Sequence, residues 1–201
     1  SIYFAFDNRG ERTIKQISLN GDLNEVASNV GGTTIGRPYI SGGFHIANGT
    51  AAYTYGKPDR PADVGIVVKG KTKVLTQLNE DILGYRKLGK VNEIIYNSSF
   101  DNEEIQGWYI TPPNFDPNKK YPLILEIHGG PHLAYGPHFS AELQMMAASG
   151  YIVFYDNYRG SSSYGEDFAL LLQYKYSSSE DFADHMSCLL YTSDAADDTR
   201  S

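Results

Sequence analysis

Hydrophobic and polar residues alternate over short stretches of the first 90 positions, in the pattern of β-strands joined by tight turns. Three of these alternating stretches are broken by turn pairs, at Asn20-Gly21, Asn48-Gly49 and Lys69-Gly70. An Asn-Gly pair between alternating runs predicts a hairpin, because both turn positions adopt a positive φ. Short strands with turns every eight to twelve residues or so are typical of a sandwich, barrel or propeller. We favour a β-propeller fragment, its last blades, over residues 1–90.

After a linker expected at 80–89, the pattern changes to strands that alternate with helices. Strands are predicted at 93–96, 105–110, 121–127 and 151–155, and helices at 139–148 and 181–186. The first helix is expected to stop at Gly150, which suits the position after a helix end. Strand, helix, strand and helix in close succession predict a parallel α/β arrangement. Residues 91–187 are therefore interpreted as the N-terminal half of an α/β-hydrolase domain with a parallel sheet.

The most informative segment is 121–131, where an apolar run ends abruptly in His128, Gly129, Gly130 and Pro131. Such a run is typical of a buried parallel strand. Paired glycines at its carboxyl end let the backbone turn sharply and approach a ligand closely. Ligands bind outside the carboxyl ends of strands in open α/β sheets. The segment resembles the oxyanion loop of α/β-hydrolases, so the backbone amides of Gly129 and Gly130 are our candidate catalytic groups.

Taken in order, four segments make the chain similar to the prolyl oligopeptidase family, in its acylaminoacyl-peptidase and dipeptidyl-peptidase-like branch. These are EIQGW at 104–108, PPNFD at 112–116, HGGP at 128–131 and NYRGSSSYG at 157–165. The resemblance implies a serine peptidase that acts on peptides, with a propeller capping the hydrolase domain. It also implies that the amide of Gly130 donates to the oxyanion. The family's Ser, Asp and His would follow residue 187, so this chain alone is expected to be inactive.

Two other functions stay open at this point. HGGP also occurs in esterases and lipases, so a carboxylesterase or lipase is one alternative, although a hairpin-rich N-terminal half argues against it. The other alternative is a non-catalytic binding module of the propeller type, with a degenerate hydrolase domain. In the downstream sequence, an intact serine elbow with later Asp and His would favour the peptidase, and a missing serine would favour the binding module. Activity on acylated peptides compared with short-chain esters would separate a peptidase from an esterase.

Several polar residues near HGGP are expected to have structural roles. His128 directly follows the predicted strand and is interpreted as a hydrogen-bonded structural histidine, while His132 and His138 are expected to be exposed. The serines at 161–163 nearly form a G-x-S-x-G elbow, but Tyr164 stands where that turn needs a small residue. We therefore expect no nucleophile there.

Two further residues are interpreted together. Glu126 interrupts an apolar strand, and a carboxylate buried without a partner is costly. Our hypothesis is that Glu126 forms an ion pair with Arg159 that supports the oxyanion loop, and the alternative is that Glu126 reaches solvent or a backbone amide. Trp108, on another predicted strand, is expected to pack in the core.

Composition excludes several functions. The chain is acidic, with a net charge of −7, and rich in aromatic residues, with 16 tyrosines. It therefore lacks the positively charged surface that binding to nucleic acid requires. No apolar stretch is long enough for a membrane span, and no zinc spacing or phosphate loop is present, so we expect no metal or cofactor. Oligomeric state and localisation are not predicted.

The last fourteen residues, 188–201, are expected to carry no function. CLLYTS followed by DAADD resembles the translated end of a transposase adapter used in sequencing libraries. On this interpretation the authentic chain stops near Ser187, and Cys188, the only cysteine, lies outside it.

Overall fold

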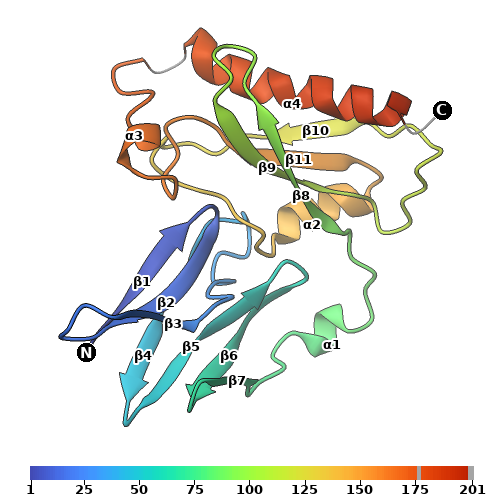
Figure 1. The fold of residues 1–201 in the computed structure, drawn as a ribbon. Helices are drawn as coiled ribbons and strands as arrows, with labels where there is room; N and C mark the ends of the chain where they lie inside the picture. The colour runs from blue at the N-terminus through green and yellow to red at the C-terminus, as the bar shows by residue number, and fades with distance from the viewer. Residues whose placement is uncertain (176–177, 199–201) are drawn as a thin grey trace.

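Two antiparallel sheets form the N-terminal part of the molecule, and a mixed sheet with helices forms the rest (Figure 1). The computed structural model describes residues 1–175 and 178–198. The first sheet has the order β1-β2-β3 and the second the order β4-β5-β6-β7, so consecutive strands pair as hairpins. Their bounds are β1 Ile2–Asn8, β2 Glu11–Ile17, β3 Leu23–Ala27, β4 Phe44–Ala47, β5 Thr50–Lys57, β6 Arg60–Val68 and β7 Lys71–Val74. The three hairpins predicted from turn pairs are confirmed, and among the described residues neither sheet closes into a barrel.

One apolar core joins these two sheets. Alternation along β2 and β5 places every second side chain inward, and the buried members are Ile14, Ala27, Val30, Ala51, Tyr53 and Val67. A bridge between Val30 and Tyr55 and a hydrogen bond from the amide of Gly31 to the carbonyl of Thr54 (3.1 Å) continue the contact beyond the named strands. The predicted linker contains one short helix, α1 Glu80–Leu83.

The third sheet has the strand order β10-β11-β9-β8. Its strands are β8 Val91–Asn97, β9 Glu104–Ile110, β10 Leu123–Glu126 and β11 Ile152–Asn157. β8, β9 and β11 pair antiparallel, whereas β10 and β11 are parallel and are connected through helix α2 Ala141–Ala148. The predicted parallel pair is therefore confirmed, inside a sheet that is mixed. In the described part of the chain β10 pairs on one side only.

Helices cover both faces of this sheet (Figure 1). Alternate residues of β11 face opposite sides: Val153 and Tyr155 pack with Trp108 and helix α2, and Phe154 packs on the face of helix α4 Ser179–Asp198. Trp108 is buried and stacks on Tyr155, with ring centroids 5.6 Å apart, which confirms its predicted core position. A short helix, α3 Glu166–Ala169, adds Phe168 to the α4 face.

The two described helices of eight residues or more differ in how well the sequence predicts them. α2 begins after Ser140, whose hydroxyl accepts a hydrogen bond from the amide of Leu143 (3.2 Å), a typical N-cap. It ends before Gly150, whose φ of +95° suits glycine. α4 extends to Asp198, well beyond the predicted 181–186, and the side chain of Cys188 is buried. The origin of residues 188–201 in an adapter stays a prediction.

The segment 35–40 joins the N-terminal sheets to the mixed sheet. Three backbone hydrogen bonds of 2.8–3.0 Å connect Ile35, Pro38 and Ile40 to the segment 134–141, which leads into α2. This docking brings Arg37 and Tyr39 next to the carboxyl end of β10. No helix of the described residues is long and apolar enough to cross a membrane.

Candidate active site

The predicted oxyanion loop follows the carboxyl end of β10. Gly129 and Gly130 are both exposed, and Gly130 has a φ of +131°, which residues with a side chain rarely adopt. Apart from Gly129 and its two chain neighbours, no atom of the described residues lies within 4 Å of the position that a Cβ on Gly129 would occupy. The loop therefore has the open, glycine-dependent backbone that close approach of a ligand requires.

The polar groups of this loop divide into satisfied carbonyls and open amides. The hydroxyl of Tyr158 donates to the carbonyl of His128 at 2.9 Å, and Nδ1 of His128 lies 3.0 Å from the carbonyl oxygen of Gly129. Within the described residues, the amides of Gly129 and Gly130 donate to no protein acceptor. These two N–H groups are available to an anionic ligand.

His128 is buried between aromatic rings, as predicted for a structural histidine. Its ring centroid lies 5.0 Å from that of Tyr135 and 4.8 Å from that of Tyr158. Nε2 lies 3.0 Å from the hydroxyl oxygen of Ser161. Burial lowers the pKa of His128, although the hydrogen bond to Gly129 acts in the opposite direction. A neutral imidazole in this place holds the backbone rather than exchanging protons with a substrate.

The serine cluster has the geometry of a structural loop. Ser161 is 0% exposed, and its hydroxyl contacts the carbonyl of Tyr158 at 2.6 Å. The hydroxyl of Ser163 accepts from the amide of Gly10 (3.1 Å), and its carbonyl accepts from the amide of Arg9 (2.8 Å). These bonds connect the loop to the first hairpin.

The expected ion pair between Glu126 and Arg159 is wrong. Glu126 pairs instead with Arg37 and accepts a hydrogen bond from the hydroxyl of Tyr135 at 3.1 Å. The physical reason is the pleat of the sheet. Glu126 is in register with Tyr155, whose side chain packs on the α2 face, whereas Arg159 extends to the α4 face. A carboxyl edge shared by two strands does not place two side chains on the same face.

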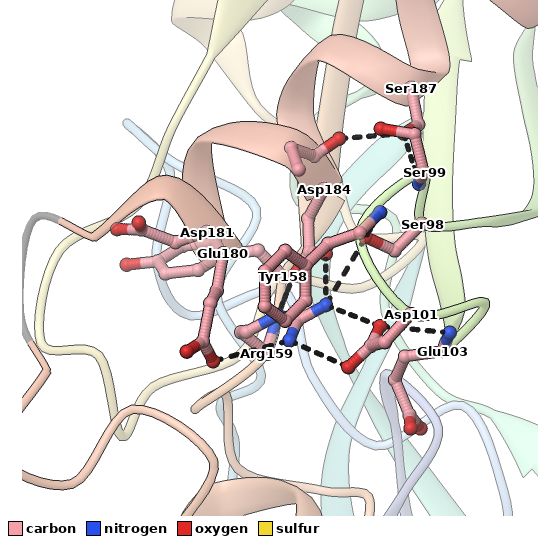
Figure 2. Close-up of polar contacts among 12 residues, drawn as sticks. Ser98, Ser99, Asp101, Glu103, Tyr158, Arg159, Glu180, Asp181, Asp184 and Ser187 are labelled. Carbon is pink, nitrogen blue, oxygen red and sulfur yellow. Dashed lines mark hydrogen bonds and ion pairs between the residues drawn. The ribbon is translucent and has the colours of Figure 1, made fainter.

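Arg159 is the centre of a buried polar cluster on the α4 face (Figure 2). Its guanidinium is 1% exposed and donates to Asp184 from Nε (2.9 Å) and from a terminal nitrogen (2.8 Å). It also forms two hydrogen bonds, of 2.9 and 3.0 Å, with Asp101 in the β8–β9 turn. Burial alone would lower the pKa of Arg159, but its bonds to Asp184 and Asp101 raise it. The cluster connects the loop after β11 to two other elements.

A second buried group lies beside this cluster. Nδ1 of His185 is 3.1 Å from both carboxylate oxygens of Asp156, and the hydroxyl of Tyr96 donates to the same carboxylate at 2.7 Å. Burial acts to lower the pKa of His185, yet the hydrogen bond and charge of Asp156 raise it overall. Sequence reasoning missed Asp156, Asp184 and His185. The signal that could have revealed these three residues is that each is a polar residue within the otherwise apolar pattern of β11 or α4.

The two histidines that lie between Gly130 and helix α2, His132 and His138, differ from each other. His132 is exposed, as predicted. His138 is only 6% exposed, so its predicted exposure is wrong. Its ring fills space left by two glycines, since a Cβ on Gly31 would lie 2.8 Å from Nδ1 and one on Gly136 would lie 2.9 Å from the ring. Nε2 has no hydrogen-bond partner among the described residues, and burial lowers the pKa of His138 to about 4.

A parallel strand followed by an exposed glycine loop with open amides is typical of the hydrolases that use an α/β sheet. Residues 137–200 match the Prolyl oligopeptidase family. The resemblance to that family is confirmed, and the relatives that the chain matches are peptidases. No group of three His, Cys, Asp or Glu residues suited to a metal ion occurs among the residues that the structure describes.

Two curated relatives each match about half of the chain. It is 40% identical over 113 residues to an uncharacterized peptidase, YuxL, of Bacillus subtilis, covering 56% of this chain and 17% of the relative. It is 37% identical over 102 residues to dipeptidyl-peptidase 4 of Giardia intestinalis, covering 49% of this chain and 13% of the relative. The chain thus spans less than a fifth of either relative.

A solved structure matches nearly the whole chain. The acylaminoacyl peptidase of Pyrococcus horikoshii superposes with a TM-score of 0.79 and 29% identity, over 94% of this chain and 28% of that one. A Mycobacterium tuberculosis puromycin-hydrolyzing peptidase superposes with a TM-score of 0.72 at 19% identity, over 93% of this chain and 29% of that one, which shows a shared fold.

Proposed function

We propose that the full-length chain containing these residues is a serine-type peptidase that hydrolyses peptide bonds by acyl transfer. The single observation that carries the proposal is the pair of open amides at Gly129 and Gly130, beyond the carboxyl end of a parallel strand. The match to a peptidase family supports it from the sequence side.

The chemistry assigned to this chain is stabilisation of the tetrahedral intermediate. When a nucleophile attacks the carbonyl carbon of a peptide bond, negative charge develops on the carbonyl oxygen. The N–H of Gly130, assisted by that of Gly129, donates to this oxygen. Removing one such donor typically costs about 2.7–4 kcal/mol of transition-state stabilisation. The nucleophilic serine and its histidine and aspartate are assigned to a part of the protein beyond residue 187, so the fragment alone is inactive.

The N-terminal sheets are proposed to be the last blades of a β-propeller. Support comes from the second sheet, whose four strands pair in sequence order, and from the superposition on an acylaminoacyl peptidase over 94% of the chain. In this arrangement the propeller restricts access to the site, and the substrates are oligopeptides or N-acylated peptides.

The test begins with the complete coding sequence and the protein that it encodes. The proposal expects a G-x-S-x-G elbow followed by Asp and His, and hydrolysis of acylated peptides in preference to short-chain esters. Preference for short-chain esters would identify a carboxylesterase instead. A complete chain without the serine, and without hydrolytic activity, would contradict the proposal and favour a binding module. Replacement of the elbow serine by alanine is the control that assigns any activity to this site.

A further inference from the structure

We propose that Arg37 neutralises the carboxylate of Glu126 and thereby makes the development of negative charge at Gly130 depend on docking of the N-terminal sheets. This inference rests on the proposed function. Arg37 is assigned no contact with the substrate and acts through Glu126. It belongs to the segment between β3 and β4, whereas Glu126 is the last residue of β10, four positions before Gly130.

The first step is the set of contacts that Arg37 makes. One terminal nitrogen of its guanidinium pairs with Glu126. Nε and the other terminal nitrogen lie 3.0 and 3.1 Å from the two carboxylate oxygens of Glu142. Each of the three nitrogens thus has a carboxylate partner, so the single positive charge of Arg37 serves these two side chains.

The second step is the difference between the two carboxylates. The side chain of Glu142 is 45% exposed and lies in the first turn of α2, where solvent and the positive end of the helix dipole both stabilise a carboxylate. The side chain of Glu126 is only 13% exposed and also accepts from the hydroxyl of Tyr135 at 3.1 Å. Removing the partner of a buried charge is costly. Glu126, rather than Glu142, therefore depends on Arg37 for its charge balance.

The third step is the position of Glu126 on the strand that leads into the oxyanion loop. Four residues of chain span at most about 14 Å, which limits the distance between the backbones of Glu126 and Gly130. At about 12 Å and an effective dielectric constant of about 20, repulsion between two unit negative charges lowers a rate by roughly tenfold. An unpaired Glu126 would oppose the charge that Gly130 is proposed to stabilise, and the charge of Arg37 offsets this repulsion.

The fourth step is the origin of Arg37 in the N-terminal part of the chain. The backbone hydrogen bonds between the segments 35–40 and 134–141 flank Arg37 on both sides. The hydroxyl of Ser140 also donates to the carbonyl of Gly36 at 2.6 Å. Loss of this docking would withdraw the positive charge and leave the carboxylate unpaired beside the loop. Catalysis should therefore be slower whenever the N-terminal sheets are displaced.

The test uses the full-length enzyme and a peptide substrate. Arg37→Met should lower kcat by about tenfold with little change in KM, because only the charged transition state is affected. Adding Glu126→Gln to Arg37→Met should restore most of the loss, whereas adding Glu142→Gln should not. Arg9→Met is the matched control, because the Arg9–Glu104 pair also joins the N-terminal part to the mixed sheet. Its removal should leave kcat unchanged.

A single substitution separates charge from packing. Glu126→Gln alone keeps an acceptor for Tyr135 and leaves Arg37 positive, so kcat should not fall below that of the wild type. A purely structural ion pair would instead make Glu126→Gln as slow as Arg37→Met. Glu126→Gln also carries the test if Arg37→Met does not fold. Arg37→Lys, which keeps the charge without the planar fork, should retain most of the activity.

Ligand binding gives a second readout. A peptide boronate, whose adduct with serine carries a negative charge, should bind Arg37→Met more weakly by the factor that is lost in kcat/KM. An alkene isostere of the substrate, which has no carbonyl oxygen, should bind the variant and the wild type equally. Parallel weakening of both ligands, or no rescue by Glu126→Gln, would overturn the inference. Failure of the wild-type enzyme to hydrolyse any peptide would instead overturn the proposed function, so the two failures are distinguishable.

Discussion

The guanidinium of Arg159 and the carboxylate of Asp184 form a buried, bidentate ion pair that connects the loop after β11 to helix α4 (Figure 2). The two contact distances are 2.9 and 2.8 Å, and neither side chain is more than 1% exposed. A planar guanidinium that meets both oxygens of a carboxylate fixes orientation as well as distance. The segment NYRGSSSYG is therefore part of the scaffold of the molecule.

Replacing Arg159 by Met should strongly destabilise the protein. The substitution leaves Asp184 buried without its partner, and breaking a buried pair in this way costs about 3–5 kcal/mol. Urea unfolding measures the change in free energy. Arg9→Met is the control, because the Arg9–Glu104 pair is exposed and such pairs contribute about 0–1 kcal/mol. Equal stability of the two variants would show that the buried cluster is not structural.

The pair of His185 and Asp156 predicts a loss of stability at alkaline pH. The pKa of His185 is raised in the folded protein, where Asp156, Asp184 and Asp181 surround it. The stabilisation is therefore complete below the ordinary pKa of about 6.5 and disappears as pH rises through the folded value. Melting temperatures measured between about pH 6 and 9 should fall for the wild type and fall less for His185→Gln. Parallel curves for the two proteins would contradict this assignment.

His138 predicts the opposite effect at acid pH. Burial lowers its pKa to about 4, so the unfolded chain binds a proton that the folded protein excludes. Stability should fall as pH decreases from about 6.5 toward 4, by about 3 kcal/mol at most. His138→Leu, which cannot be protonated, should flatten the stability curve in this range. A wild-type curve that is already flat there would show that the folded protein accepts the proton.

The open edge of β10 predicts self-association of the isolated 201-residue chain. Leu123 on that strand is exposed, as are Ile127 and Leu133 just beyond it, and unpaired edges with apolar side chains favour aggregation. Leu123→Lys should increase the soluble, monomeric fraction measured by size-exclusion chromatography with light scattering. Leu19→Lys, at an exposed hairpin turn, should leave it unchanged. A monodisperse wild-type chain would contradict the prediction.

The order of strands and helices could be read from the sequence because its determinants are local. Asn20-Gly21 and Asn48-Gly49 specify hairpins through their own backbone preferences, and Ser140 and Gly150 define the two ends of α2. The parallel neighbours β10 and β11 followed from the strand-helix-strand pattern.

Partners of buried charges could not be read in this way. Arg159 and Asp101 are 58 residues apart, and Glu126 pairs with Arg37 from the N-terminal part. Such pairs depend on which face of the sheet each side chain occupies and on how the two parts dock. His138 was placed wrongly for the same reason, because the space that it fills is created by glycines distant in the chain, such as Gly31.

The central claim is that the amide of Gly130 binds the oxyanion of a peptide-hydrolysing site. The most direct measurement is a crystal structure of the full-length protein with a peptide boronate bound to its serine. We predict a boronate oxygen about 2.7–3.1 Å from the nitrogen of Gly130. A covalent adduct in which that oxygen is held by other donors, with the amide of Gly130 facing away from it, would contradict the claim.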